Sequence, residues 1–444
     1  MKSLKRVFWW SLLALGGIWW LADQTDWAAL DGVFAWRAVL SQASGVLAIG
    51  VMSLAMLLTV RAPWLERRLG GLDKMYRLHK WLGISALVLA VSHWLIVSGP
   101  KWMVALGWLE RRGRRSRPGF PDEPLRQFLL DQRGLAEGIG EWAFYGAALL
   151  MVLALVKRFP YRRFFQTHRL LAVAYLALVL HALVLLKFEY WSTPLGATMA
   201  ALLTGGTVAA VMSLFRLRAG GTRVSGTVAA LEAQETVGVT AVDIRLDGGW
   251  PGHGAGQFAF VTLHPDEGPH PFTIASAWAG DGRLRFLIKG LGDYTRSLPG
   301  RLQVGDRVRV EGPFGRFDFR GDTRRQIWIG GGIGIAPFVA RLKELARQPD
   351  GKAIDLFHTT TRYDPAIIDR LQSDARAARV NLHVLWDERD GLLELDRLFR
   401  TVPDWREADV WFCGPSAFAR KVREGLVSLG LPERRFHQEL FELR

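Results

Sequence analysis

Four histidines in the apolar first half of the chain are the residues most able to do chemistry there. His79 and His93 lie fourteen residues apart on one apolar segment, and His168 and His181 lie thirteen apart on another. Ionisable side chains are costly inside a bilayer, so they usually serve as ligands or proton relays. At about 1.5 Å of rise per helical residue, the spacings span about 21 and 20 Å, enough to hold two stacked haems between two helices.

The spacings pair the histidines across the two segments, because each haem would take one neutral imidazole from each helix. Because both segments would cross the membrane in the same outward direction, His79 pairs with His168 at an inner site, and His93 pairs with His181 at an outer site. Fourteen residues return to within about 40° of the same helix face, whereas thirteen leave about 140°, so the second helix needs a distortion or differently rotated haems. Ordinary core histidines or a proton relay are the alternatives. A catalytic metal centre is disfavoured, because no carboxylate or thiol accompanies the histidines.

A glycine-rich loop in the second half of the chain is the main nucleotide signal. Gly330–Pro337 directly follows the strand-like run Gln326–Ile329 and opens a helical stretch. Glycines let backbone amides approach a phosphate, and the start of a helix favours an anion. A glycine loop alone is a weak signal, but its position between strand and helix favours nucleotide binding. The residues expected at the nucleotide are Gly331, Gly332, Gly334 and Pro337.

Further motifs surround this loop in a fixed order. Gly256–Phe258 precedes the stretch His-Pro-Phe-Thr-Ile-Ala-Ser at 270–276, and Ile-Lys-Gly-Leu-Gly-Asp-Tyr-Thr follows at 288–295. Cys413–Pro415 comes after the strand-like run Val410–Phe412. Together these motifs resemble the ferredoxin-NADP reductase superfamily. With the four histidines, the chain resembles the NADPH oxidase and ferric reductase group, from the third apolar segment to the carboxyl terminus.

The resemblance implies an FAD site in the first of these regions. The 270–276 stretch would line the isoalloxazine, with the backbone and the Thr273 hydroxyl at its polar edge and Phe272 packed nearby. The 288–295 segment would hold the pyrophosphate, since glycine permits close backbone approach and Lys289 and Thr295 can meet phosphate oxygens. A plain glycine-rich turn is the alternative for this segment. The expected FAD residues are His270, Pro271, Phe272, Thr273, Ser276, Lys289, Gly292 and Thr295.

The resemblance also implies a nicotinamide site. Thr360 and Arg362 follow the next strand, where relatives bind the adenosine side, and Arg362 could grip a 2′-phosphate and so favour NADPH over NADH. A solvated surface arginine is the alternative. Cys413, with Gly414 and Pro415, would lie beside the nicotinamide and leave room for hydride transfer, whereas a buried inert thiol is the other reading. Phe441 is the expected aromatic at the flavin face, with Phe436 as the second candidate, unless the last strand simply packs its aromatics.

The implied activity is hydride transfer from NADPH, or possibly NADH, to FAD, followed by single-electron transfer through two b-type haems. Oxygen, giving superoxide, is the favoured acceptor on the opposite side. Ferric iron is the alternative in the reductase branch. A conduit linked to quinone or to a partner subunit is the hypothesis from a different class.

Six apolar segments must position the histidines, each about 15 to 22 residues where a bilayer core needs about 20. They are Val7–Leu21, Val39–Val60, Leu78–Val97, Ile139–Val156, Leu170–Leu186 and Leu195–Phe215. Basic residues in the second-to-third and fourth-to-fifth connections, and at the amino terminus, place both ends inside. The basic loop Arg111–Arg117 between the third and fourth segments disagrees with that orientation.

The second half changes to short alternating runs punctuated by glycine, such as Val224–Leu231 and Val239–Leu246, which favour an antiparallel barrel. From Arg325 onward, strand-like and helical stretches alternate, as in a parallel doubly wound sheet. We therefore expect an all-α six-helix di-haem membrane bundle over 1–218. An antiparallel β-barrel FAD domain over 219–322 and an α/β nucleotide-binding domain over 323–444 follow it.

Composition agrees with a membrane half and a soluble half, and it bears on the cellular compartment of the soluble half. The net charge of +15 over 444 residues could suggest nucleic acid, but the basic residues cluster beside apolar runs, which favours membrane topology. One cysteine excludes an intrachain disulfide and thiolate clusters. We expect a multi-pass protein of the inner cell membrane with its nucleotide domains in the cytoplasm. The lipid bilayer, NADPH and the acceptor are the expected partners, and the sequence requires no protein partner.

Overall fold

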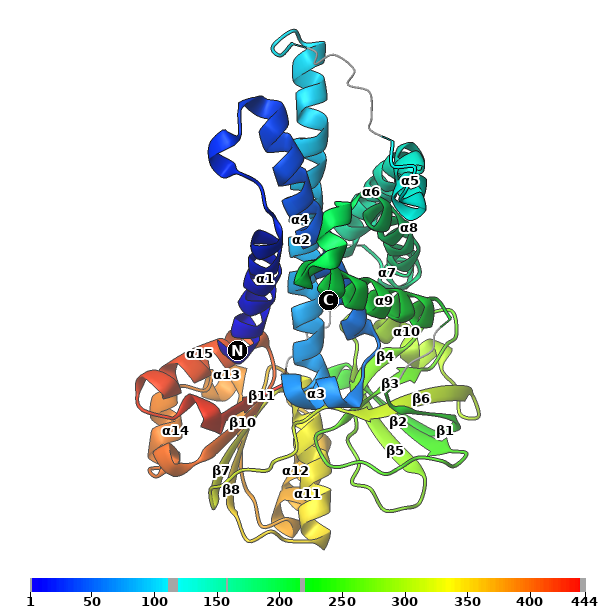
Figure 1. Ribbon diagram of the computed structural model, residues 1–444. Coiled ribbons are helices and arrows are strands. Elements are labelled where there is room, and N and C mark those ends of the chain that lie inside the picture. Colours follow the sequence, from blue (N-terminus) through cyan, green and yellow to red (C-terminus); the bar gives the residue numbers. More distant parts are fainter. Residues whose placement is uncertain (1, 111–118, 157–158, 216–219, 440–444) are drawn as a thin grey trace. The chain divides into compact units, whose positions relative to one another are not determined.

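The computed structural model describes residues 2–110, 119–156, 159–215 and 220–439 (Figure 1). The basic loop Arg111–Arg117 lies outside the described residues. The chain divides into two compact units near Gly220, and only Gly71–Asp73 from the first part of the chain group with the second unit. The barrel and the α/β region belong to the same second unit.

The first unit is helical throughout its regular structure. Its longer helices match the expected apolar segments but extend beyond them at several ends. The helices are α1 (Lys2–Ala22), α2 (Gly32–Thr59), α3 (Pro63–Leu69), α4 (Leu72–Ala105), α5 (Pro124–Asp131), α6 (Arg133–Leu155), α7 (Tyr161–His168), α8 (Leu170–Leu185) and α9 (Pro194–Leu214).

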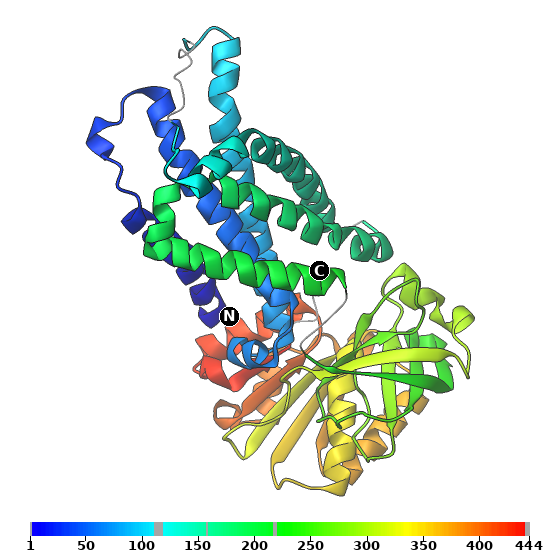
Figure 2. The same ribbon diagram turned by 45° about the vertical axis from the view of Figure 1, so that its right-hand side comes forward.

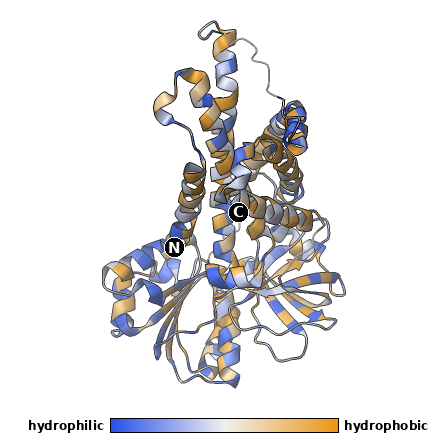
Figure 3. Cartoon of the chain, in the orientation of Figure 1, coloured by the Kyte–Doolittle hydropathy of each residue, from blue (hydrophilic) through white to orange (hydrophobic). Residues whose placement is uncertain are grey.

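Among the described residues, five helical stretches are long and apolar enough to cross a membrane: α2, α4, α6, α7 with α8, and α9. Figure 3 colours much of these helices toward the hydrophobic end of the scale. The first expected segment does form a helix, α1, but α1 is not among the five. Its basic first turn and its four tryptophans lower its hydropathy. The structure therefore supports five candidate spans, and a sixth is a proposal.

The helices pack closely in some pairs and not in others. The backbone of α6 runs against α8, and α2 packs against α9 and α8. Small residues permit this, since a Cβ on Gly206 of α9 would lie 2.7 Å from a ring carbon of Tyr175. Among the described helices, α4 forms no backbone pairing as close as these. Side chains therefore span the space between α4 and its neighbours.

The second unit begins with a six-stranded antiparallel sheet in the order β4-β3-β6-β1-β2-β5. An isolated bridge between Ile274, just after β4, and Phe286 in β5 joins the two edges, so the sheet is a nearly closed barrel. Alternating apolar side chains from β2, β5 and β6 fill its interior. The strands are β1 (Thr222–Gln234), β2 (Val239–Leu246), β3 (Phe258–Thr262), β4 (His270–Thr273), β5 (Arg283–Lys289) and β6 (Arg307–Phe314), with α10 (Asp293–Arg301) between the last two.

The remainder of the second unit is an α/β layer structure around a parallel five-stranded sheet, in the order β11-β10-β7-β8-β9 (Figures 1 and 2). Its strands are β7 (Arg325–Gly331), β8 (Ala353–Thr360), β9 (Asn381–Trp386), β10 (Asp409–Cys413) and β11 (Phe436–Gln438). Its helices are α11 (Ala336–Arg347), α12 (Pro365–Ala377), α13 (Asp387–Asp390), α14 (Leu395–Thr401) and α15 (Ser416–Ser428).

Alternate residues of the central strand β7 face opposite layers of helices. Trp328 packs with side chains of α11 and α12 on one face of the sheet. Ile327 and Ile329 pack with side chains of α14 and α15 on the other. Both faces of a parallel sheet must be covered because its strands are apolar on both sides. The strand order reverses between β7 and β10, and ligands of such sheets bind at the carboxyl ends of the strands at this point.

Candidate functional site

The structure brings the four membrane-half histidines together in the two expected pairs. The ring centroids of His79 and His168 are 6.0 Å apart, with the rings inclined by 72°. Those of His93 and His181 are 6.4 Å apart, at 89°. Both pairs join α4 to the α7–α8 stretch, so the two pairs lie at different levels along the same two stretches of helix.

These separations suit an iron atom between each pair. Metal–imidazole nitrogen bonds are about 2 Å long and the ring centroid lies about 1 Å behind the nitrogen, so two imidazoles on opposite sides of one iron have centroids about 6 Å apart. Each pair offers two ligands, which suits a metal whose other ligands come from a porphyrin. Within the described residues, no group of three or more His, Cys, Asp or Glu is arranged to hold a bare ion.

Hydrogen bonds at Nδ1 orient the rings. The Nδ1 of His79 lies 2.9 Å from the Ala55 carbonyl of α2, and the Nδ1 of His181 lies 2.8 Å from the Ala136 carbonyl of α6. A carbonyl oxygen only accepts, so in each ring Nδ1 carries the proton and donates it. The neutral ring then keeps its lone pair on Nε2. These contacts therefore prepare Nε2 as the metal ligand.

The other two histidines differ from each other in their Nδ1 partners. The Nδ1 of His93 lies 3.0 Å from the Ser44 hydroxyl, and that hydroxyl donates its own proton to the Leu40 carbonyl at 2.6 Å. Because the Ser44 proton goes to Leu40, we assign Nδ1 of His93 as the donor to the Ser44 oxygen. The Nδ1 of His168 is buried and has no hydrogen-bond partner among the described residues, although the Phe164 ring stacks on the imidazole at 4.9 Å.

Two glycines give the rings of the second pair their space. A Cβ on Gly140 of α6 would lie 2.6 Å from Cγ and 2.5 Å from Cε1 of His181, and closer still to Nδ1. A Cβ on Gly45 of α2 would lie 3.2 Å from Cε1 of His93. Sequence reasoning missed both glycines, because they lie on helices that carry no histidine.

The helix that carries His168 and His181 has the expected irregularity. Its regular hydrogen bonding is interrupted at Arg169, so α7 ends at His168 and α8 begins at Leu170. The Ala172 amide bonds to the Arg169 carbonyl, which is a tighter turn than an α-helix makes. The Arg169 guanidinium donates to the Leu214 carbonyl at 2.9 Å. The interruption lies between the two histidines, and it is a distortion of the kind that was one of the two expected answers to the thirteen-residue spacing.

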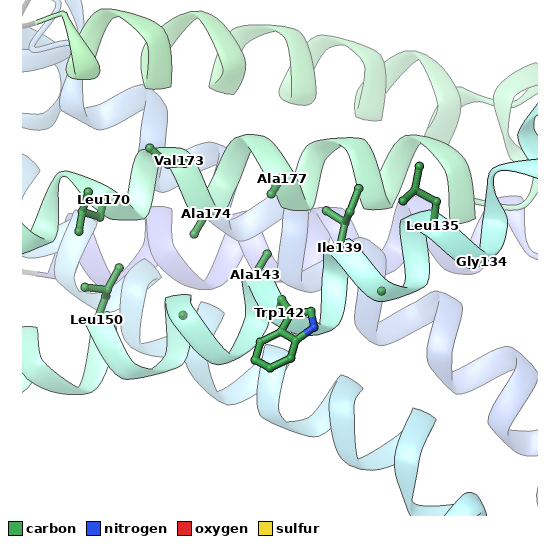
Figure 4. A pocket seen from close by; sticks show the side chains of 12 residues that line it. Gly134, Leu135, Ile139, Trp142, Ala143, Leu150, Leu170, Val173, Ala174 and Ala177 are labelled. Atoms are coloured by element: carbon green, nitrogen blue, oxygen red, sulfur yellow. The ribbon is translucent and has the colours of Figure 1, made fainter.

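An apolar groove of about 740 Å³ runs between α6 and α8 (Figure 4). Trp142, whose side chain is 78% exposed, lies along it with Ile139 and Leu150 of α6 and Ala174 of α8. It offers no histidine or carboxylate to a cofactor. The groove therefore forms part of the apolar surface of the two helices, whereas the paired histidines are the candidate metal site of this unit.

In the second unit, two motifs far apart in sequence meet at the point where the strand order reverses. Cys413 of β10 pairs in register with Gly330 of β7. A Cβ on Gly334 would lie 2.6 Å from the Cys413 carbonyl carbon, and one on Gly414 would lie 3.1 Å from Gly331 Cα. Gly331, Gly334 and Gly414 are thus the residues that let the two loops approach. Pro337 is buried at the start of α11, and Pro415 is exposed.

Lys289 at the end of β5 lies beside this glycine loop. Its Nζ is 3.7 Å from the position that a Cβ on Gly332 would take, and Gly332 has φ +56. The ammonium group is therefore placed to meet a phosphate held by the loop. From sequence, Lys289 was expected only at the FAD pyrophosphate. Its position beside the nucleotide loop comes from the barrel and the α/β sheet together.

The expected flavin residues form an aromatic surface on the barrel. His270 of β4 lies nearly parallel to Phe272, with centroids 6.2 Å apart, and 4.7 Å from the Tyr294 ring of α10. Burial lowers the pKa of His270, so its ring is neutral near pH 7. Pro271 and Thr273 lie on the same strand, half-buried.

Two of the expected flavin hydroxyls make structural bonds. The Thr295 hydroxyl accepts the amides of Leu291 and Gly292 at 3.0 Å each and so stabilises the start of α10. The Ser276 hydroxyl accepts the Arg285 amide at 3.1 Å beside the bridge that closes the barrel. These bonds shape the flavin region, and a direct bond from either hydroxyl to FAD stays a prediction.

Thr360 is the last residue of β8, and Arg362 follows two residues later. The end of β8 lies next to the glycine loop, since Thr359 pairs with Gly331 of β7. The Thr360 hydroxyl donates to the Arg362 carbonyl at 2.7 Å and so forms a tight local turn. The Arg362 side chain is exposed, with Nη1 3.6 Å from the position of a Cβ on Gly238. The guanidinium is accessible to a phosphate, and its expected role stays a prediction.

Cys413 is buried, with 2% of its surface exposed, and burial raises the pKa of its thiol well above the usual range, as does the nearby Glu439 carboxyl. Glu439 is 6% exposed, and a Cβ on Gly315 would lie 2.8 Å from its Oε1. Sequence reasoning missed this carboxyl. Phe441 lies outside the described residues. Phe436 stacks on Phe412 with centroids 6.2 Å apart and belongs to the core of the α/β sheet.

Comparisons with known proteins show what the chain is similar to. Residues 44–179 match the family model of the ferric reductase like transmembrane component. The chain is 32% identical over 209 residues to the stachydrine N-demethylase reductase subunit of Rhizobium meliloti, which covers 43% of this chain and 58% of that protein. It is 28% identical over 222 residues to the flavohemoprotein of Bordetella pertussis, which covers 44% and 54%. The chain thus spans little more than half of each relative.

Solved structures align as well. A flavohemoglobin from Malassezia yamatoensis aligns over 90% of this chain and 98% of its own, with 17% identity and a TM-score of 0.48. A cytochrome P450 reductase from Amycolatopsis aligns over 50% and 70%, with 23% identity and a TM-score of 0.44. The family match and the two relatives together show a ferric-reductase-like transmembrane domain and a region similar to the reductase subunit and the flavohemoprotein.

Proposed function

We propose that the chain carries electrons from cytoplasmic NADPH across the inner membrane to an acceptor on the opposite side, through FAD and two b-type haems. The observation that carries the proposal is the presence of two imidazole pairs at different levels along the same two helical stretches. The ring centroids are 6.0 Å apart in one pair and 6.4 Å apart in the other. Two such pairs form a path along the membrane normal, which a single metal site would not. When bound, the flavin would take a hydride and release single electrons, and each haem would carry one electron.

The residues of the first unit would hold the haems and fix their orientation. His79 with His168, and His93 with His181, supply one Nε2 each. The carbonyls and hydroxyl that accept from Nδ1 belong to α2 and α6, so these helices set the rotation of the rings. The proposal includes α1 as a sixth span, since its 21 residues reach about 32 Å, close to the bilayer core.

The residues of the second unit would hold the two nucleotides against each other. The loop Gly330–Gly334 offers backbone amides, and Lys289 offers a cation, to the pyrophosphate of NADPH. Gly414 leaves space beside Cys413 for the nicotinamide. The aromatic surface of His270 and Phe272 supports the FAD isoalloxazine. The raised pKa of Cys413 keeps its thiol uncharged, so it would act as a small packing group and not as a nucleophile.

Oxygen, giving superoxide, is the proposed acceptor, and ferric iron is the second candidate. Arg37 of α2 donates to the Val97 carbonyl at 3.2 Å, one helical turn beyond His93. A cation at this position would favour an anionic product such as superoxide, and it would equally attract an anionic ferric chelate. The match to a ferric reductase like transmembrane component supports the second candidate.

The test is anaerobic reduction of the purified full chain by NADPH, followed by visible spectroscopy. Flavin bleaching followed by the bands of reduced b-type haem is the expected order. Oxygen or ferric citrate is then admitted separately, and the faster haem reoxidation identifies the acceptor. A protein with full flavin content and no haem band would contradict the proposal.

The variant His93→Ala should lose one of two haems and the reoxidation, while NADPH still bleaches the flavin. Ser92→Ala is the matched control, because the Ser92 hydroxyl bonds only to the Val88 carbonyl of its own helix. Loss of flavin bleaching in His93→Ala would mean that the two units do not work as separable modules.

A further inference from the structure

The two imidazole pairs differ in their hydrogen bonds. In the His93–His181 pair both rings donate from Nδ1, to the Ser44 hydroxyl and to the Ala136 carbonyl. In the other pair His79 donates to the Ala55 carbonyl, whereas Nδ1 of His168 is buried without a partner among the described residues. The pairs are otherwise alike in ligand type and separation. The two pairs therefore differ in the hydrogen-bond partners of Nδ1.

A hydrogen bond at Nδ1 changes the metal bond at Nε2. Donation to an oxygen moves electron density into the ring and makes Nε2 a stronger base. A stronger base stabilises the more highly charged metal, so it favours ferric over ferrous iron and lowers the midpoint potential. On this ground the pair with two donated bonds is the more electron-donating one.

The Ser44 hydroxyl is the partner that most distinguishes His93 from His168, because a further hydrogen bond polarises this hydroxyl. It donates to the Leu40 carbonyl at 2.6 Å while it accepts from His93, and its side chain is buried. Hydrogen bonds in such a chain strengthen one another in a medium of low dielectric. The order of donors fixes one direction: imidazole to hydroxyl to carbonyl. Ser44 therefore acts on the metal through His93 without touching it.

We propose that Ser44 is a positioning residue that makes the His93–His181 pair the stronger electron donor and lowers the midpoint potential of the haem bound there. The inference rests on the proposed function and deepens it. A haem of lower potential at the pair nearer the acceptor holds its electron less tightly. Electron release to a one-electron oxidant is then more favourable at that pair than it would be without Ser44.

The test is a spectroscopic redox titration of the full chain, wild type against Ser44→Ala. Removal of one such bond should shift the ratio of oxidised to reduced haem at a fixed potential by up to about tenfold. For a one-electron couple, tenfold corresponds to about 59 mV. The transition of the His93–His181 haem should rise by up to this amount, and the other transition should stay where it is. The transition missing from His93→Ala identifies which haem is which.

Two further variants keep the result interpretable. Ser44→Thr retains the hydroxyl and should restore the wild-type potential. Ser92→Ala removes a hydroxyl from the residue next to His93 that bonds only within α4, and it should leave both potentials unchanged. If Ser44→Ala loses its haem, Ser44→Thr and low-temperature electron paramagnetic resonance of the ferric state still report the bond, since the spectrum follows ligand strength and orientation.

The outcomes separate the inference from the proposed function. A wild-type chain without haem would defeat the proposed function itself. Two haems with an unchanged potential in Ser44→Ala would overturn the role of Ser44 alone, and would show that the Ser41 carbonyl, which also interacts with this ring, replaces it. Equal shifts of both haems, or a shift in Ser92→Ala as large as in Ser44→Ala, would also overturn it.

Discussion

Gly140→Ala should remove one haem from the chain without unfolding it. The added Cβ would lie 2.6 Å from Cγ of His181 and closer still to Nδ1, so the ring must retreat by more than about 1 Å to reach ordinary contact. That movement lengthens the 2.8 Å bond between Nδ1 and the Ala136 carbonyl beyond hydrogen-bonding range. Overpacking costs about 1–3 kcal/mol, and alanine in a helix recovers up to about 1 kcal/mol of it.

The effect on the metal site should exceed the effect on stability. Loss of an outer hydrogen bond to a ligating histidine lowers metal affinity by about 10- to 100-fold. The assay is haem per chain, from the absorption spectrum of the dithionite-reduced protein, with flavin content as the internal standard. We expect a fall from two haems toward one, while the flavin content stays constant.

Gly138→Ala is the matched control for this variant. Gly138 lies on the same helix, and nothing lies within 4 Å of the position its Cβ would take. It should keep two haems and gain slightly in thermal stability, because alanine is the better helix former. Two intact haems with an unaltered spectrum in Gly140→Ala would refute the assignment of His181 as a ligand held by α6.

Three other predictions concern the second unit. Gly334→Ala would place a Cβ 2.6 Å from the Cys413 carbonyl carbon, so flavin bleaching by NADPH should slow at least tenfold in stopped flow while FAD content stays constant. Burial alone would raise the pKa of Asp409, but hydrogen bonds from a neighbouring threonine and from His437 lower it. The stability this adds is present above the ordinary carboxyl pKa and is lost as pH falls through the lowered value. The melting temperature of Asp409→Asn should therefore be depressed at pH 7 and converge on that of the wild type only as the pH falls below the ordinary carboxyl pKa. Arg362→Ala should raise KM for NADPH more than KM for NADH. Equal changes in the two KM values would refute the assignment of Arg362 to the 2′-phosphate.

The sequence predicted the elements well because their patterns are local. The barrel strand Val239–Leu246 and the helix that follows the glycine loop are found where apolar periodicity and glycine placed them. The pairing of His79 with His168 also followed from the spacing and from the common direction of the two apolar segments. Even the difficulty with thirteen residues was informative, since the helix is interrupted at Arg169, between the two histidines that needed it.

The parts that the sequence could not predict depend on contacts between distant segments. Gly140 has no local signal that distinguishes it from Gly138, two residues away, yet only one of them faces an imidazole. Lys289 lies in a motif assigned to FAD, and only the folded second unit places it beside Gly332. Glu439 was overlooked beside the more conspicuous aromatic at 441. Each of these residues lies close to a residue that is distant in the sequence, and the linear pattern does not indicate which one.

The helices without histidines therefore orient most of the histidine rings of the proposed haem sites. Helices α2 and α6 bear no ligand, but they hold three of the four rings through the Ala55 carbonyl, the Ser44 hydroxyl and the Ala136 carbonyl. The ligand-bearing α4 makes no backbone pairing as close as that between α6 and α8 among the described helices, so its rings gain their orientation from these partners. Substitutions on α2 and α6 that face a ring should thus alter haem content or potential, while substitutions on the same helices that face away should not. The proposed di-haem bundle predicts this difference between the two faces of each helix.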